Sequence, residues 1–519
     1  MSVKVLLASK SALITKYGRP GFRKVIEAAA LMKGADKKRK FNTSLVFVDD
    51  PATMRRYGGR AVTDVTSGQQ HKEAIDAIYA ASEPEYLVIL DAPDVIPHVS
   101  MINPAAGDGD LDVPSDLPYA CGTPFSRDPA RNLSITRVVG RIPGIRGAVH
   151  PTHLTNAMKA AAEFKPRPRK DYMTCFALSA QVWEKSTTRN IDVIFGKGSV
   201  NKVRTSPPTE DARTNRFLSP LMHFINCHGA PQSPDFYGQR KRDMSMDFTA
   251  LMTEGVAANV KRNTVIAAEC CYGASLYDPN LEKSLRQPIA NSYFDRGAIA
   301  FFGSTNTAYG DAARLSAADY LTQYFLLNVL AGASLGRAVL EARQFFVNDK
   351  DFDNYCKKTI AQFILLGDPS LHPCLEDDAA DDQLKQMANQ KIARRIRRME
   401  LLALGKSAGE SAAFGGKKGR KPSGKLAKQA KSIARRLGVR PHNIESYDVS
   451  GGELYRGAMR SQKFKPRMIE VSQASPPIKE IVGGKPHVRH HVKAVVVHTH
   501  GTGIARVAHY ISKSWAPNA

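Results

Sequence analysis

Short apolar runs alternate with amphipathic segments along the first 375 residues. The strand-like runs lie at 3–9, 43–49, 86–92, 135–142, 222–228, 264–270 and 298–304. Between them, stretches such as 21–34 and 71–82 repeat their apolar residues at the spacing of a helix. Short apolar strands separated by helices are typical of a mostly parallel sheet with helices on both faces. The pattern therefore predicts an α/β fold.

The pattern changes after residue 375. A basic helical stretch at 391–405 is followed by a segment rich in Gly, Ser and Lys at 409–425, which is typical of a flexible linker. From about residue 441 β-like runs return, and two of them, at 492–499 and 504–512, flank the sequence HGTG. Two such runs around a glycine-rich tetrapeptide predict a hairpin in a small β-rich unit.

The net charge of +25 is concentrated rather than spread along the chain. Residues 385–440 contain 17 Lys and Arg against only Glu400 and Glu410. Such a segment favours contact with nucleic acid or with an acidic partner. Because no aromatic residues alternate with Arg394, Arg395, Arg397 and Arg398, base stacking is not indicated.

Composition narrows the class of protein and its location. No run approaches the roughly 18 apolar residues that a membrane span requires, so we expect a soluble protein without a membrane partner. The first residues have no long apolar core and no small-residue cleavage site, so we expect no export signal. Seven cysteines, an odd number that includes an adjacent pair, do not suggest a disulfide framework. We expect a cytoplasmic protein.

Two of the apolar runs end in reactive side chains. One ends at Cys227-His228-Gly229 and the other at Glu269-Cys270-Cys271. Loops beyond the carboxyl ends of parallel strands form the crevice where ligands bind, so a His and a Cys there would face each other. An imidazole within reach of a thiol can take its proton and later protonate a leaving amine.

The glycine after the histidine supports the same chemistry. A tetrahedral intermediate needs backbone N–H groups directed at its oxyanion, and Gly229 supplies one amide while the nucleophilic Cys supplies another. Taken separately, a His-Gly pair is more often a turn and a buried Cys-Cys pair more often core. Zinc bound by Cys227, His228, Cys270 and Cys271 is disfavoured, because adjacent Cys residues rarely chelate one ion and no C-x-x-C spacing is present. We therefore expect no metal.

These motifs resemble those of the caspase, legumain and gingipain superfamily of cysteine peptidases. The sequence is similar to gingipains in particular at 86–97 (YLVILDAPDVIP), 116–120 (DLPYA), 135–144 (ITRVVGRIPG), 297–310 (GAIAFFGSTNTAYG) and 363–373 (FILLGDPSLHP). All the motifs follow the family's order, and the resemblance ends near residue 375.

The resemblance implies a caspase-like fold with two α/β subdomains. An N-terminal subdomain would cover 1–144 and a catalytic subdomain 145–375, followed by the basic linker at 376–440 and a small C-terminal β-containing domain at 441–519. It also implies a dyad in which His228 is the general acid/base, with the oxyanion held by the amides of Gly229 and the nucleophilic Cys. Calcium is a possible cofactor by resemblance only, since no acidic loop in the sequence demands it.

Two cysteines compete for the role of nucleophile. The superfamily usually carries an acidic residue or Gln two positions before the nucleophile, and Glu269 has this spacing to Cys271. Gingipains tend to carry Gly three places after the nucleophile, and Gly273 has that spacing to Cys270. We favour Cys271, with Cys270 as the alternative.

The resemblance also implies a substrate pocket. The residue two before the nucleophile, Glu269, would line the pocket for the side chain before the scissile bond, where a carboxylate suits Lys or Arg. Asp128 matches a second acidic residue of the family, with Asp116 as its substitute, and Tyr309 matches an aromatic residue that covers the pocket. For Asp128 and Tyr309, simple loop solvation is the competing interpretation.

The sequence thus predicts a cysteine endopeptidase that forms a thioester and cuts protein or peptide substrates after Arg or Lys. Self-cleavage in the basic linker, near Lys417, Lys418, Arg420 and Lys421, would follow from that specificity. The alternative from a different class is an inactive peptidase-like scaffold that binds nucleic acid or an acidic protein through residues 385–440.

Overall fold

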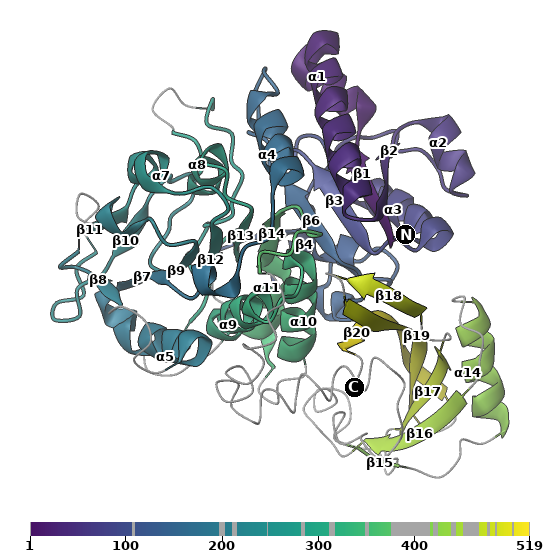
Figure 1. The fold of residues 1–519 in the computed structure, drawn as a ribbon. Helices are drawn as coiled ribbons and strands as arrows, with labels where there is room; N and C mark the ends of the chain where they lie inside the picture. Colours follow the sequence, from purple (N-terminus) through teal and green to yellow (C-terminus); the bar gives the residue numbers. More distant parts are fainter. Residues whose placement is uncertain are drawn as a thin grey trace.

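A ten-stranded sheet forms the centre of the computed structural model (Figure 1). The structure describes residues 2–105, 109–196, 203–209, 215–246, 248–281, 286–310, 317–347, 352–374, 416–418, 424–436, 443–449, 467–474, 478–482, 485–500 and 503–517. In spatial order the strands are β2 (Phe41–Phe47), β1 (Ser2–Ala8), β3 (Tyr86–Leu90), β6 (Val139–Ile142), β14 (Phe363–Gly367), β13 (Ala300–Ser304), β12 (Val265–Ala268), β9 (Met222–Asn226), β7 (Cys175–Ala180) and β8 (Arg204–Ser206).

Helices cover both faces of this sheet. One layer contains α1 (Lys10–Lys38), α4 (Thr152–Glu163), α8 (Ile289–Asp295) and α7 (Thr253–Asn259). The other contains α5 (Glu184–Phe195), α9 (Ala317–Leu330), α10 (Leu335–Val347) and α11 (Asn354–Gln362). Two further helices, α2 (Pro51–Arg56) and α3 (Gly68–Ser82), belong to the N-terminal part. Because strands covered on both faces have no polar side, β3, β9 and β12 are buried at every position.

Short elements fill the connections. They are the antiparallel pairs β4 (Val99–Ile102) with β5 (Asp112–Ser115) and β10 (Phe236–Gly238) with β11 (Phe248–Leu251), and the 3₁₀ turns η1 (Leu117–Ala120), η2 (Pro129–Asn132), η3 (Arg169–Tyr172), η4 (Gln181–Trp183) and η5 (Asn215–Phe217).

The direction of the strands reverses once in the sheet. β13 and β14 pair antiparallel, whereas every other neighbouring pair is parallel. The carboxyl ends of β9, β12 and β13 therefore share one edge with the amino end of β14, into which α11 runs. This single sheet joins the segments predicted as two subdomains, since β14 also pairs with β6. The predicted α/β class, a mostly parallel sheet flanked by helices, is confirmed.

A second sheet lies in the C-terminal part of the chain. Its strands run in the order β15 (Gly416–Lys418), β16 (Asn443–Val449), β17 (Arg467–Ala474), β19 (Lys485–His500) and β18 (Ile478–Val482), with β20 (Gly503–Pro517) paired to β19. The helix α14 (Gly424–Arg436) packs against β17 and β19. The hairpin predicted around HGTG is the β19–β20 pair.

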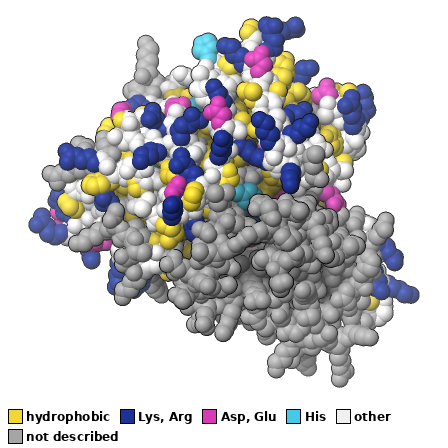
Figure 2. All heavy atoms as spheres, viewed as in Figure 1, with side chains coloured by type: hydrophobic (Ala, Val, Ile, Leu, Met, Phe, Trp, Pro, Cys, Tyr) yellow, Lys and Arg dark blue, Asp and Glu magenta, His cyan; other side chains and the backbone are white. Residues whose placement is uncertain are grey.

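Two sequence predictions remain to be compared with the structure: the absence of a membrane span and the concentration of basic charge in residues 385–440. Among the described residues, none of the helices combines the length and apolarity needed to cross a membrane. Figure 2 shows Lys and Arg side chains spread over one face, with acidic side chains among them. The arginines at 394–398 lie outside the described residues.

Candidate active site

The His-Gly and Cys-Cys sequences lie side by side at one edge of the sheet. β9 and β12 are parallel neighbours in which Ile225 pairs with Ala268. The amide of Glu269 donates to the carbonyl of Ile225 at 2.8 Å, which extends this pairing beyond the strand. His228 and Cys271 each follow these paired residues by three positions, so tertiary structure brings their loops together.

Gly229 packs directly against the backbone of Cys271. A Cβ built on Gly229 would lie 1.9 Å from the carbonyl oxygen of Cys271, so no larger residue fits without displacing that loop. The Gly229 amide also lowers the pKa of the Cys271 thiol, against the larger opposite effect of burial. The loop that carries His228 therefore lies in contact with the residue that carries the thiol.

A hydrogen bond and an aromatic contact orient His228. Its Nε2 lies 2.8 Å from Oε1 of Gln239, and the Gln239 amide group donates to the Met244 carbonyl at 3.1 Å. The Gln239 carbonyl therefore faces the ring, and the neutral ring carries its proton on Nε2 and accepts at Nδ1. The Trp183 ring lies 4.4 Å from the imidazole, centroid to centroid. Burial lowers the pKa of His228, while the Gln239 hydrogen bond opposes that shift.

The substitution Gln239→Glu tests this arrangement. A carboxylate on His228 Nε2 favours the imidazolium, so the pKa of His228 should rise by about one unit or more. Because the neutral ring is the base, the acidic limb of the kcat/KM profile should move to higher pH from a wild-type midpoint below 6.5. Gln239→Ala, which adds no charge, is the control. An acidic limb that stays in place in Gln239→Glu would remove Gln239 from contact with the base.

The two cysteines lie in different environments. Cys270 is fully buried, its sulfur lies 3.7 Å from the Ile225 carbonyl, and burial raises the pKa of this thiol well above its usual value. Cys271 is half-buried, and the Ala308 N–H donates to its sulfur at 3.3 Å. Burial also raises the pKa of the Cys271 thiol, opposed by the Ala308 amide and Lys358. Of the two thiols, Cys271 is the more exposed, and Cys270 lies in the core.

Glu269, which directly precedes the two cysteines, lies in a buried polar cluster. It accepts a hydrogen bond from the Thr322 hydroxyl, and the Asn190 amide lies 3.5 Å from its Oε1. The same Asn190 amide donates to Asp319 at 2.9 Å. Burial, and next the neighbouring Asp319 carboxyl, raise the pKa of Glu269 well above its usual value. Two neighbouring carboxyl groups disfavour two negative charges, so Glu269 holds its proton more tightly than a free carboxyl group does. Sequence reasoning missed Asp319, since its local sequence carries no signal of this role.

The other predicted pocket residues have different surroundings. Asp128 caps η2 by accepting from the Ala130 amide at 2.9 Å, and its hydrogen bonds within the described residues stay inside 126–132. Asp116 instead forms a buried two-bond ion pair with Arg141, at 2.9 and 2.7 Å. The structure thus gives both carboxylates partners away from Cys271.

Tyr309 lies next to the site. It is half-buried and directly follows Ala308, whose amide contacts the Cys271 sulfur. Its ring meets Tyr355 edge-on with centroids 4.8 Å apart. The structure therefore brings Tyr309 to the same loop cluster as His228, Gly229 and Cys271.

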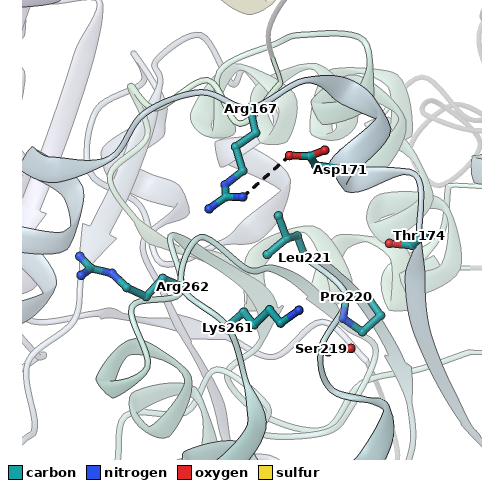
Figure 3. A pocket seen from close by; sticks show the side chains of 8 residues that line it. All are labelled: Arg167, Asp171, Thr174, Ser219, Pro220, Leu221, Lys261 and Arg262. Atoms are coloured by element: carbon teal, nitrogen blue, oxygen red, sulfur yellow. Dashed lines mark ion pairs between the residues drawn. The ribbon is translucent and has the colours of Figure 1, made fainter.

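A cavity of about 490 Å³ opens at the opposite edge of the sheet (Figure 3). Arg167, Lys261 and Arg262 line it together with Asp171, which pairs with Arg167 at 3.8 Å. Its walls precede β7, β9 and β12, so it lies at the amino ends of the strands that carry His228 and Cys271 at their carboxyl ends. It takes no part in the His-Cys site.

No group of three or more His, Cys, Asp or Glu side chains in the described part of the chain is arranged to hold a metal ion. All seven cysteines are free, including Cys227, Cys270 and Cys271, the three that were weighed as zinc ligands together with His228. Calcium binding stays a prediction from resemblance.

Comparisons with known proteins agree with this fold. Residues 220–374, which contain His228, Cys270 and Cys271, match Peptidase family C25. The fold is similar to the crystal structure of the Arg-specific cysteine proteinase gingipain R, with a TM-score of 0.50, 10% sequence identity, and coverage of 98% of this chain and 97% of that chain. No curated protein matched the sequence.

Proposed function

We propose that this gingipain-like cysteine peptidase hydrolyses peptide bonds with Cys271 as nucleophile and His228 as general acid/base. The observation that carries the proposal is the contact of Gly229 with Cys271, which holds the His228 loop against the loop of the thiol. The chemistry requires an imidazole and a thiol within reach of one substrate carbonyl.

The reaction follows from the positions of these groups. Cys271 Sγ attacks the scissile carbonyl carbon while its proton passes to His228 Nδ1, and the oxyanion accepts hydrogen bonds from the amides of Gly229 and Cys271. The C–N bond then breaks, and His228 protonates the leaving amine. Water, deprotonated by His228, attacks the resulting thioester and releases the acid and the thiol. Gln239 holds the ring in the tautomer that this cycle uses.

We further propose that the enzyme cuts after Arg or Lys. Glu269 stands two residues before Cys271, and its carboxyl shares its buried cluster with Asp319. A substrate cation that reaches Glu269 would favour loss of the proton that burial and Asp319 hold there, and would form a charge-assisted contact with the carboxylate. The roles of Asp128 in binding the cation and Tyr309 in covering the pocket rest on the family resemblance.

Three further expectations belong to the same proposal. Lys417 and Lys418 lie in β15, where their backbone pairs with β16, so self-cleavage there requires that strand to separate; Arg420 and Lys421 lie outside the described residues. A cytoplasmic location, and contact of residues 385–440 with an acidic partner or nucleic acid, stay predictions. Within that segment the structure describes β15 and the basic helix α14, and α14 is the part that would take part.

The experiment compares wild type with Glu269→Gln on a fluorogenic peptide library varied at the residue before the scissile bond. Wild type should prefer Arg and Lys, and Glu269→Gln should lower kcat/KM for these substrates by about 10- to 100-fold, because a hydrogen bond to a charged group is lost. Substrates with a neutral residue at that position are the control, and their hydrolysis should change little. Equal losses for all substrates would exclude Glu269 from specificity, and an absence of hydrolysis by wild type would favour the inactive scaffold.

A further inference from the structure

A buried lysine and an aspartate from distant parts of the chain meet beside the candidate nucleophile. Lys358, on α11, is fully buried, and its Nζ donates to Asp110 Oδ2 at 2.6 Å. Asp110 precedes β5 in the N-terminal part of the chain. The Lys358 ammonium also lies 5.1 Å from the centre of the Tyr309 ring. A buried ammonium is held only where a carboxylate and other polar groups offset its lost hydration.

The Asp110 carboxylate also holds both loops that flank Cys271. Its Oδ1 accepts from the Tyr272 hydroxyl at 2.7 Å, and its Oδ2 accepts from the Thr307 amide at 3.0 Å. Tyr272 directly follows Cys271 and has a φ of 57°, in the left-handed region that a non-glycine residue adopts at a cost. Thr307 directly precedes Ala308, whose amide contacts the Cys271 sulfur. One carboxylate thus connects α11, the nucleophile loop and the loop that donates to the thiol.

We propose that Lys358 and Asp110 are a positioning pair for Cys271, in which the Lys358 ammonium stabilises the thiolate and Asp110 holds that ammonium and the two loops in place. The proposal rests on the proposed function in one respect, the choice of Cys271 as nucleophile. It adds two residues to the site that belong to neither the His-Cys dyad nor the substrate pocket.

The two charges should act on the thiol in opposite directions. Burial is the largest influence and raises the pKa of Cys271; the amides of Ala308 and Gly229 and the Lys358 charge lower it, and the Asp110 charge raises it. A positive charge nearby favours the thiolate and a negative charge disfavours it. If the pair only held the loops together, the loss of either partner would instead shift the pKa of Cys271 in the same direction.

The test is the pH dependence of iodoacetamide alkylation of Cys271 in the full chain, followed by mass spectrometry of the peptide that contains it. Lys358→Met should raise the midpoint of alkylation by about one pH unit or more. Asp110→Asn keeps one oxygen that can accept from Lys358 but removes the negative charge, so it should lower the midpoint. Lys358→Arg, which keeps the charge, should keep the midpoint near that of wild type. Tyr272→Phe removes a hydrogen bond to Asp110 without changing charge, so its shift should be much smaller than that of either charge variant.

The outcomes separate this proposal from the proposed function. Shifts in the same direction for Lys358→Met and Asp110→Asn, or no shift in either, would overturn the positioning pair even if wild type hydrolyses peptides. Opposite shifts would support the pair even if wild type proved inactive on every peptide, since alkylation reports the thiol alone. If Lys358→Met fails to fold, Lys358→Gln, which removes the charge and keeps a donor for Asp110, takes its place in the comparison.

Discussion

Replacement of Cys271 by Ala is expected to lower kcat for peptide hydrolysis by on the order of 10⁴-fold or more. The substitution removes the atom that forms the thioester, and the remaining oxyanion donors and substrate contacts supply only the residual rate that enzymes keep without their nucleophile. Fluorogenic Arg or Lys substrates measure the loss. Any self-cleavage in the basic segment should disappear with it, so the intact masses of wild type and variant should differ if self-cleavage occurs.

Cys270→Ala is the matched control for this prediction. Cys270 is fully buried against the Ile225 carbonyl, so its loss should cost about 1 kcal/mol of folding free energy and change kcat only a few-fold. Hydrolysis that survives in Cys271→Ala and disappears in folded Cys270→Ala would reverse the assignment of the nucleophile.

Asp116→Ala is expected to destabilise the fold by about 3–5 kcal/mol, because it leaves the guanidinium of Arg141 buried without its carboxylate. Arg141 is fully buried, and its remaining hydrogen bonds go to the carbonyls of Asp91 and Ile96. Urea unfolding measures the change. Asp128→Ala is the control: it removes only the cap of η2 and should cost about 1 kcal/mol. Similar losses for the two variants would contradict the structural role of Asp116.

The Asp116–Arg141 ion pair also predicts how the folding stability changes with pH. Burial alone would raise the pKa of Asp116, but Arg141 and further groups hold the pKa below its usual range. A carboxyl whose pKa is lower in the folded state contributes stability that is present above the unfolded pKa of 3.8 and is lost as pH falls through the folded value. The stability difference between wild type and Asp116→Ala should therefore shrink below about pH 4.

The apolar runs predicted seven of the ten strands of the central sheet, because a strand covered on both faces must be apolar throughout, but they missed β7, β8 and β14. The runs at 222–228 and 264–270 contain β9 and β12, and the run at 298–304 contains β13. The apolar pattern did not predict which strands pair with each other or in which direction. β14 looks like any other apolar run, yet it is inserted antiparallel to β13, since pairing depends on contacts between residues far apart in the chain.

For the site, the sequence by itself determined which reactive residue types are present and in which order they occur. A His-Gly pair comes first and a Cys-Cys pair second, and each directly follows a buried strand. Local spacing carries this information because the carboxyl ends of parallel strands meet at one edge. Only the tertiary structure separated Cys270 from Cys271 by burial, placed Gln239 on His228, and brought Asp319 to Glu269. It likewise brought Lys358 and Asp110, 248 positions apart, into one ion pair beside the thiol. Charge and burial act through space, and no local pattern records which distant groups a fold brings together.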